Sequence, residues 1–235
     1  IKKTNFYGLN MILAIDTSTQ WLSLALYDSE NEVFPFEKTW RSTRRHTIEL
    51  APAVAEILHD GGIVAKDLPA IAIATGPGSF TSLRIGLAFA KGMALANHAA
   101  LIGVPSLDVL AFSIPAASMP LICVLQAGRS KLAARRYQYD EGWITHGEIF
   151  VTSPQQLSEE IETDTLICGE MNAEERRLVG RKWKKAHVYP PSLSVRRASY
   201  LAEIAAQKLA GGHTDDSMTL APIYLHTADP IPNLD

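Results

Sequence analysis

The sequence lacks a strong net charge, a metal-binding pattern of cysteines and any long apolar run. Lysine and arginine number 22 against 25 aspartate and glutamate residues, so the formal net charge is −3 and there is no general attraction to nucleic acid. Cys123 and Cys168 lie far apart in apolar runs, which predicts reduced core residues in a reducing compartment. With no signal peptide or transmembrane segment predicted, we expect a cytoplasmic protein without a membrane partner.

The usual signatures of catalysis are also missing. None of the seven histidines is spaced i, i+4 from another, so no helical HxxxH or HExxH face can form and no metal is predicted. No GxSxG motif is present, and neither cysteine has a local base. We therefore expect no catalytic residue in this chain.

What the sequence does contain is two similar runs of strands and helices. The first half predicts strands at 12–16, 21–28, 32–39, 70–75 and 100–104, and helices at 47–60, after the loop at 76–79, and from Ser106. The second half predicts strands at 120–127, 131–140, 143–152 and 165–170, and helices at 154–161, 173–180 and 194–210. This order of strands and helices indicates two related α/β units with mixed sheets.

The prolines and small residues near 112–119 are the best candidate for a boundary between the units. Residues 1–10 are interpreted as an extension or a cloning remnant, and residues 11–112 as the first domain. Residues 113–235 form the second, whose last helix is a candidate to pack back on the first domain.

The most informative stretch is ATGPGSFTSLRIGLAFAKGMALA, residues 74–96. Gly76 and Gly78 permit unusual backbone angles, and the helix that follows could hold a phosphate at its N-terminus. The stretch lacks the Gly-Lys-Ser/Thr ending of a P-loop and the GxGxxG spacing of a dinucleotide fold, so a plain strand-to-helix connection is favoured.

The helix in this stretch is apolar on more than one side. One stripe contains Leu83, Leu87, Ala90 and Ala94, and the adjoining stripe contains Ile85, Ala88, Phe89, Gly92 and Ala96. A surface helix needs only one apolar stripe. Either this helix and the one at 47–60 both lie in the interior of the chain, or one face of each is covered by a partner chain. The close approach of a partner would offset the loss of helix stability caused by Gly86 and Gly92.

Several of these segments together resemble the bacterial TsaB (YeaZ) family. The segments are ILAIDTST, RRHTIELAPAV, TGPGSFTSLRIGLAFAKGMA, GVPSLDVLA and the C-terminal Pro222–Leu225, with the clearest similarity over residues 11–112. The resemblance implies an actin-like (ASKHA-type) pair of domains. It also implies a non-catalytic dimerisation subunit for threonylcarbamoyladenosine (t6A) synthesis at adenosine 37 of tRNA.

In this family the catalytic partner is TsaD, which forms a heterodimer with TsaB and transfers the threonylcarbamoyl group, while TsaE joins a larger complex that binds tRNA. The resemblance implies no tightly bound cofactor, with ATP or ADP at the interface with the partner. Alone, the chain is expected to form a homodimer, because an exposed apolar patch seldom remains unpaired.

The resemblance and the apolar helices together predict the site residues. The predicted partner interface consists of His46, Leu50, Val54, Pro77, Gly78, Ser79, Phe80, Thr81, Leu83, Arg84, Gly86, Leu87, Ala90 and Ala94. A vestigial phosphate loop is predicted at Asp16, Thr17 and Ser18, where Asp16 either binds hydrated Mg²⁺ or, as we favour, bonds to turn amides.

Three positions depart from the family pattern: Ser82 stands where glycine is usual, Gln126 where an acidic residue is common, and His226 where arginine is common. The alternative function is an actin-like small-molecule kinase or ATPase, and a metalloprotease is a weaker third reading. The basic clusters, such as the one around Trp183, are interpreted as solvated faces rather than an independent RNA site.

Overall fold

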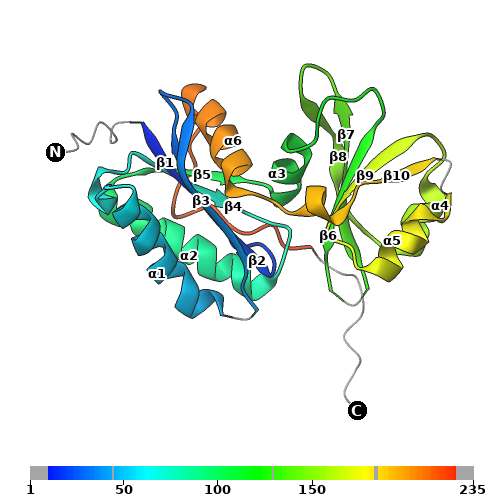
Figure 1. The fold of residues 1–235 in the computed structure, drawn as a ribbon, viewed down its shortest axis with the longest axis horizontal. Helices are drawn as coiled ribbons and strands as arrows, with labels where there is room; N and C mark the ends of the chain where they lie inside the picture. Colours follow the sequence, from blue (N-terminus) through cyan, green and yellow to red (C-terminus); the bar gives the residue numbers. More distant parts are fainter. Residues whose placement is uncertain (1–9, 44, 129, 183–184, 226–235) are drawn as a thin grey trace, which may run out of the picture.

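The computed structural model describes residues 10–43, 45–128, 130–182 and 185–225 and consists of two five-stranded sheets with helices on their faces (Figure 1). Residues 1–9 of the predicted extension at 1–10, together with Trp183 and His226, lie outside these ranges. The first sheet contains β1 (Met11–Asp16), β2 (Trp21–Asp28), β3 (Val33–Arg41), β4 (Ala70–Ala74) and β5 (Ala100–Val104). The second contains β6 (Leu121–Gln126), β7 (Leu132–Tyr139), β8 (Trp143–Thr152), β9 (Thr165–Gly169) and β10 (Ala186–Val188). The helices are α1 (His46–Asp60), α2 (Phe80–Asn97), α3 (Ser106–Phe112), α4 (Pro154–Glu160), α5 (Ala173–Val179) and α6 (Ala198–Ala210).

The two sheets repeat one topology. The strand order is β3-β2-β1-β4-β5 in the first sheet and, read in the same direction, β8-β7-β6-β9-β10 in the second. In both, the first strand pairs antiparallel with the second and parallel with the fourth. The predicted class of two related α/β units with mixed sheets is therefore confirmed.

The first sheet is covered on both faces, and its central strands β1 and β4 are buried and mostly apolar on both sides, as strands covered on both faces require. Leu13 and Ile15 of β1 share a core with α1 and α2, whereas Ile12 and Ala14 share a core with α6. The side facing α6 is rich in alanine, contributed by Ala14, Ala25, Ala70, Ala72 and Ala74. These small side chains, with Ala198, Ala202 and Ala205 of α6, allow the helix to pack closely on the sheet.

The second sheet contacts the first half of the chain through α3. Leu107 and Leu110 of α3 pack with Leu121 and Cys123 of β6, so α3 lies between the two sheets (Figure 1). Both cysteines are buried free thiols. α4 and α5 cover the outer face of the second sheet. No helix within the described ranges is long and apolar enough to cross a bilayer.

The last helix begins later than predicted. Helix was expected from 194, but residues 191–194 form a 3₁₀ turn and α6 begins at Ala198. Arg197 is extended, and the first turn of α6 is satisfied from the sheet, because Ala198 N–H donates to Ser23 Oγ and Ser199 N–H to Glu37 Oε1. The short strand β10 was also not predicted, since only three residues form it.

The two glycines of α2 have different surroundings. A Cβ on Gly86 would lie 2.0 Å from Oγ1 of Thr17, so the close approach at this glycine is made by the chain's own turn rather than by a partner. Thr17 cannot easily rotate away, because it is fully buried and its Oγ1 donates to the Ser82 carbonyl. Gly92 is exposed, and a Cβ there would meet nothing within 4 Å.

We expect opposite effects when the two glycines are replaced by alanine. Gly86→Ala should lower the free energy of unfolding by about 1–3 kcal/mol through overpacking against Thr17. Gly92→Ala should raise it by about 0.5–1 kcal/mol, because it removes backbone freedom in an exposed helix interior. Urea denaturation measures both changes, and a neutral or stabilising Gly86→Ala would contradict the packing described.

Candidate functional site

The predicted phosphate loop is a buried turn between β1 and β2 whose polar groups bond to one another. Asp16 Oδ1 accepts hydrogen bonds from the Ser18 backbone N–H at 2.8 Å and from Ser18 Oγ at 2.5 Å. Ser18 Oγ also lies 2.6 Å from Ser106 Oγ. Asp16, Thr17 and Ser18 are all buried. The groups that would face a phosphate are therefore already used in the turn.

Arg196 occupies the space between the two halves of the chain beside this turn. Its Nε donates to Asp16 Oδ2 at 2.9 Å, its Nη1 to Glu170 Oε1 at 2.7 Å and its Nη2 to Thr19 Oγ1 at 3.0 Å. Burial opposes its charge, but the carboxylates of Asp16 and Glu170 more than offset this and raise the pKa of the guanidinium. Because Asp16 is the last residue of β1 and Glu170 directly follows β9, one cation joins the two sheets.

The sequence reasoning did not identify Arg196 or Glu170. Arg196 has no exposed side-chain surface, although arginine is almost never fully buried unless paired. Its position next to Arg197 resembles an ordinary solvated basic pair in sequence, and no local pattern distinguishes the two. The ion pair becomes visible only in the folded structure, which brings Arg196 next to Asp16 although the two residues are far apart in the sequence.

An open cleft of about 750 Å³ lies in front of this network. Its walls include Gln20, Phe80, Gln126, Glu170 and Tyr224. The rings of Phe80 and Tyr224 pack in a tilted arrangement with a centroid distance of 5.0 Å, and the Arg84 guanidinium lies 5.0 Å from the centre of the Phe80 ring. Phe80 remains 56% exposed. Glu170, whose Oε1 also accepts from Thr19 Oγ1, is held by the buried network, so the acidic wall of the cleft is already neutralised by Arg196.

The structure corrects much of the predicted partner interface. Eight of the predicted side chains or backbone positions are buried within the chain, namely His46, Leu50, Val54, Leu83, Gly86, Leu87, Ala90 and Ala94. Most of them belong to the core between the helices and the first sheet, where apolar side chains leave water most completely. Pro77 is buried and Gly78 half-buried, so only Ser79, Phe80, Thr81 and Arg84 are exposed among the predicted residues.

The same helices expose a different, adjoining set of apolar residues. This α1–α2 outer face consists of Ile48, Ala51, Pro52 and Ala55 of α1 and Ala88, Gly92, Leu95 and Ala96 of α2. The two helices lie side by side on one face of the first sheet (Figure 1). Ile48 and Leu95 are 61% and 57% exposed. The second of the two stripes read from the sequence is therefore the outward one.

Comparisons with known proteins identify the family. A family model described as TsaD, tRNA N6-adenosine threonylcarbamoyltransferase, matches residues 40–205, which is more than half of the chain. The chain belongs to this family. Relatives within the family are named tRNA threonylcarbamoyladenosine biosynthesis protein TsaB, as the resemblance to TsaB (YeaZ) predicted.

The TsaB similarity is spread unevenly over the chain. The Escherichia coli protein is 36% identical over 58% of this chain and 59% of its own length, and the Haemophilus influenzae protein is 26% identical over 91% and 92%. The chain thus spans less than two thirds of the first of these relatives. A solved structure of YeaZ from Pseudomonas aeruginosa is similar in fold, with a TM-score of 0.74 and 23% identity over 91% of this chain and all of that one. The expected α/β fold with two mixed sheets is confirmed, and it is shared with YeaZ.

Replacing Arg196 tests whether this network joins the two halves. Arg196→Met leaves Asp16 and Glu170 buried without a counter-charge and should lower the free energy of unfolding by about 3–5 kcal/mol. The matched control is Arg197→Met, because Arg197 is half-exposed and its ion pair with Glu37 should be worth at most about 1 kcal/mol. Equal losses in urea unfolding would show that the buried network is not the main link.

His46 should make stability depend on pH. It is 3% exposed at the start of α1, and its Nε2 has no hydrogen-bond partner among the described residues. Burial lowers its pKa, although the Thr19 backbone and the carboxylates of Glu49 and Asp16 act in the opposite direction. A neutral ring is therefore favoured in the folded chain. The contribution of the neutral ring to the free energy of unfolding is complete above about pH 6.5 and is lost as the pH falls.

We expect His46→Gln to flatten the decline in urea-unfolding stability between pH 8 and pH 5, because the variant has no ring to protonate at the positive end of a helix dipole. His59→Gln is the control, since that side chain is 87% exposed. Parallel pH profiles for wild type and His46→Gln would contradict the assignment.

Proposed function

We propose that this chain is a non-catalytic subunit that pairs with a TsaD-type protein and supports the synthesis of t6A in tRNA. The relatives named TsaB are described as proteins of the biosynthesis of this nucleoside. The main observation in support of a non-catalytic role is the position of Arg196. This side chain lies between the two halves and forms ion pairs with both Asp16 and Glu170. In this proposal TsaE and tRNA reach the chain only through the larger complex.

The buried network also disfavours the alternative of an actin-like kinase or ATPase. Such an enzyme needs free backbone N–H groups for the phosphates and a free carboxylate for Mg²⁺. Here the Ser18 N–H and both oxygens of Asp16 are engaged within the chain. ATP or ADP would then bind between this chain and its partner, without a tightly held cofactor in this chain alone.

The α1–α2 outer face is the surface proposed for pairing. It combines two large exposed side chains, Ile48 and Leu95, with small residues that allow a second pair of helices to approach closely. Apolar surface of this kind is stabilised when another chain removes it from water. When the partner is absent, the same face pairs two copies of the chain.

Substituting exposed alanines on this face should disrupt the pairing without unfolding the chain. Ala51→Arg and Ala88→Arg each place a charge in the centre of the α1–α2 outer face and should weaken the complex with the cognate TsaD-type protein about thirtyfold or more. Calorimetry measures the affinity, size-exclusion chromatography the co-elution, and light scattering the homodimer.

Ala116→Arg is the matched control, because Ala116 is exposed in the segment between α3 and β6, away from this face. It should leave pairing unchanged. If both helix variants bind the partner as tightly as wild type, the pairing surface lies elsewhere; if wild type itself never binds under any nucleotide condition, the subunit proposal is wrong.

A further inference from the structure

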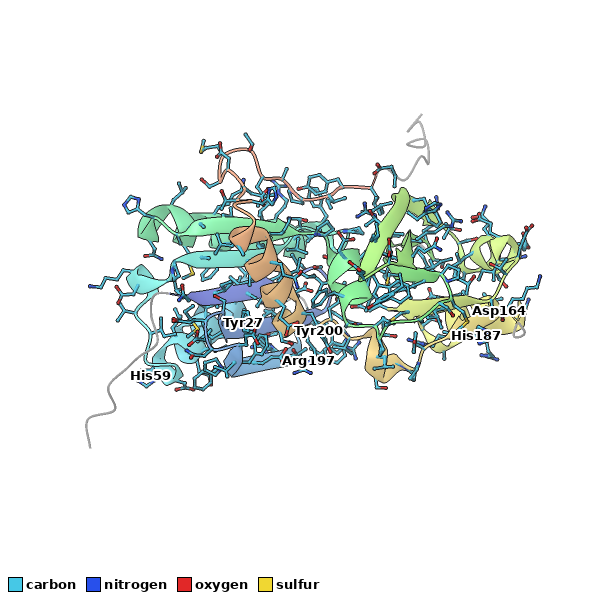
Figure 2. The ribbon with its side chains drawn as sticks, turned by 90° about the horizontal axis from the view of Figure 1, so that it is seen from above. Tyr27, His59, Asp164, His187, Arg197 and Tyr200 are labelled. Carbon is cyan, nitrogen blue, oxygen red and sulfur yellow. The ribbon has the colours of Figure 1, made fainter. Side chains whose placement is uncertain are left out.

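A second large pocket lies on the opposite face of the first sheet from the α1–α2 outer face. It has a volume of about 720 Å³ and lies between the β2–β3 hairpin and the C-terminal half of α6. Figure 2 shows Tyr27 beside α6 on this side of the molecule. The pocket is lined by Tyr27, Glu32, Glu203, Gln207 and Leu209, among others. It is within the size range of small-molecule sites.

Tyr27 is a largely buried side chain whose hydroxyl has no hydrogen-bond partner among the described residues. It is 8% exposed, and its ring stacks on Phe34 with a centroid distance of 4.5 Å. Its hydroxyl makes no hydrogen bond to any described residue, and Tyr27 lines the pocket. Burial raises the pKa of Tyr27, and the charges of Glu203 and Glu32 raise it further, so the hydroxyl remains protonated. Its oxygen is free to accept a hydrogen bond from a ligand.

Two carboxylates in the pocket are also uncompensated. Neither Glu32 nor Glu203 forms a hydrogen bond or ion pair with a described residue, and no lysine, arginine or histidine is among the pocket's described lining. Partial burial raises the pKa of Glu203, and the charges of Glu32 and Glu37 raise it further. The pocket is therefore a region of negative potential that the folded chain does not neutralise.

The chemistry of the lining favours an organic cation over a metal ion. Across the described residues, no group of three or more His, Cys, Asp or Glu side chains is placed to hold a metal. One wall is aliphatic, formed by Ala206, Leu209 and Ala210 of α6. An ammonium group needs acceptor oxygens, which Glu32, Glu203 and Tyr27 supply, and an alkyl chain needs an apolar wall.

We propose that this pocket binds an alkylammonium ion, with the ammonium group between Glu32 and Glu203, a hydrogen bond to the Tyr27 hydroxyl, and the alkyl chain along α6. Two sources can supply this chemistry. One is a free diamine or polyamine, and the other is a lysine side chain; in the sequence Lys2 and Lys3 shortly precede Asn10, which also lines the pocket. The site does not depend on pairing with TsaD, because it lies on the other face of the sheet.

The test titrates the full chain with spermidine and with 1,5-diaminopentane at physiological salt, by calorimetry and by thermal unfolding. We expect saturable binding and a concentration-dependent rise in Tm, since a ligand that binds only the folded chain stabilises it. The uncharged 1,5-pentanediol and Mg²⁺ should produce neither. Equal stabilisation by Mg²⁺ or by the diol would overturn the assignment of an organic cation, as would no saturable binding by either amine.

Three variants locate the site. The double variant Glu32→Gln and Glu203→Gln should weaken binding about tenfold or more, and it should fold well because it removes a repulsion. Tyr27→Phe keeps the ring stacking and should weaken binding about fivefold. Glu148→Gln removes a charge from exposed β8 and should bind as wild type does. Binding that falls as much in Glu148→Gln as in the double variant would be a general charge effect and would overturn the site.

A further variant distinguishes the two sources of the cation. If a lysine of the chain itself occupies the pocket, Lys2→Gln with Lys3→Gln should bind the diamine more tightly than wild type. If the pocket takes a free amine, the affinity should be unchanged. Either result supports the alkylammonium assignment, whereas loss of diamine binding in this variant would contradict it.

Discussion

The ion pairs of Arg196 are the interaction on which the arrangement of the two halves depends. A fully buried arginine is tolerated only because two carboxylates and a hydroxyl surround it, and these come from both sheets. Val195 and Arg197, on either side of Arg196, are extended, and α6 begins at Ala198. One charge network therefore occupies the interior of the cleft and connects the two sheets.

The two faces of the first sheet differ in how they are covered. On one side α1 and α2 have 15 and 18 residues and expose an apolar outer surface, whereas their counterparts in the second half, α4 and α5, have seven residues each. Among the described residues, α1 and α2 are thus about twice as long as α4 and α5 and offer a more extended face to another chain. On the other side the alanine-rich packing of α6 leaves an acidic pocket at the hairpin.

Local patterns made much of the architecture predictable. The strand at 100–104 and the pair at 131–140 and 143–152 have apolar periodicity and turn residues that depend on neighbours in sequence, and the structure places strands there. The site was less predictable. Leu83 and Ala88 are equally apolar residues of one helix, and nothing local tells which of them faces the sheet, so the buried stripe was mistaken for the interface.

The sequence by itself determined the class of fold, the resemblance to the TsaB (YeaZ) family and the lack of a helical metal-binding pattern, because each depends on residues close together along the chain. Only the tertiary structure decided which stripe of the helix is exposed to water. It also decided that residue 86 must lack a Cβ because Thr17 packs against it, and that Arg196 pairs with Asp16, 180 residues away in sequence. Such contacts join segments that the chain separates, and their energies depend on burial, which no local pattern records.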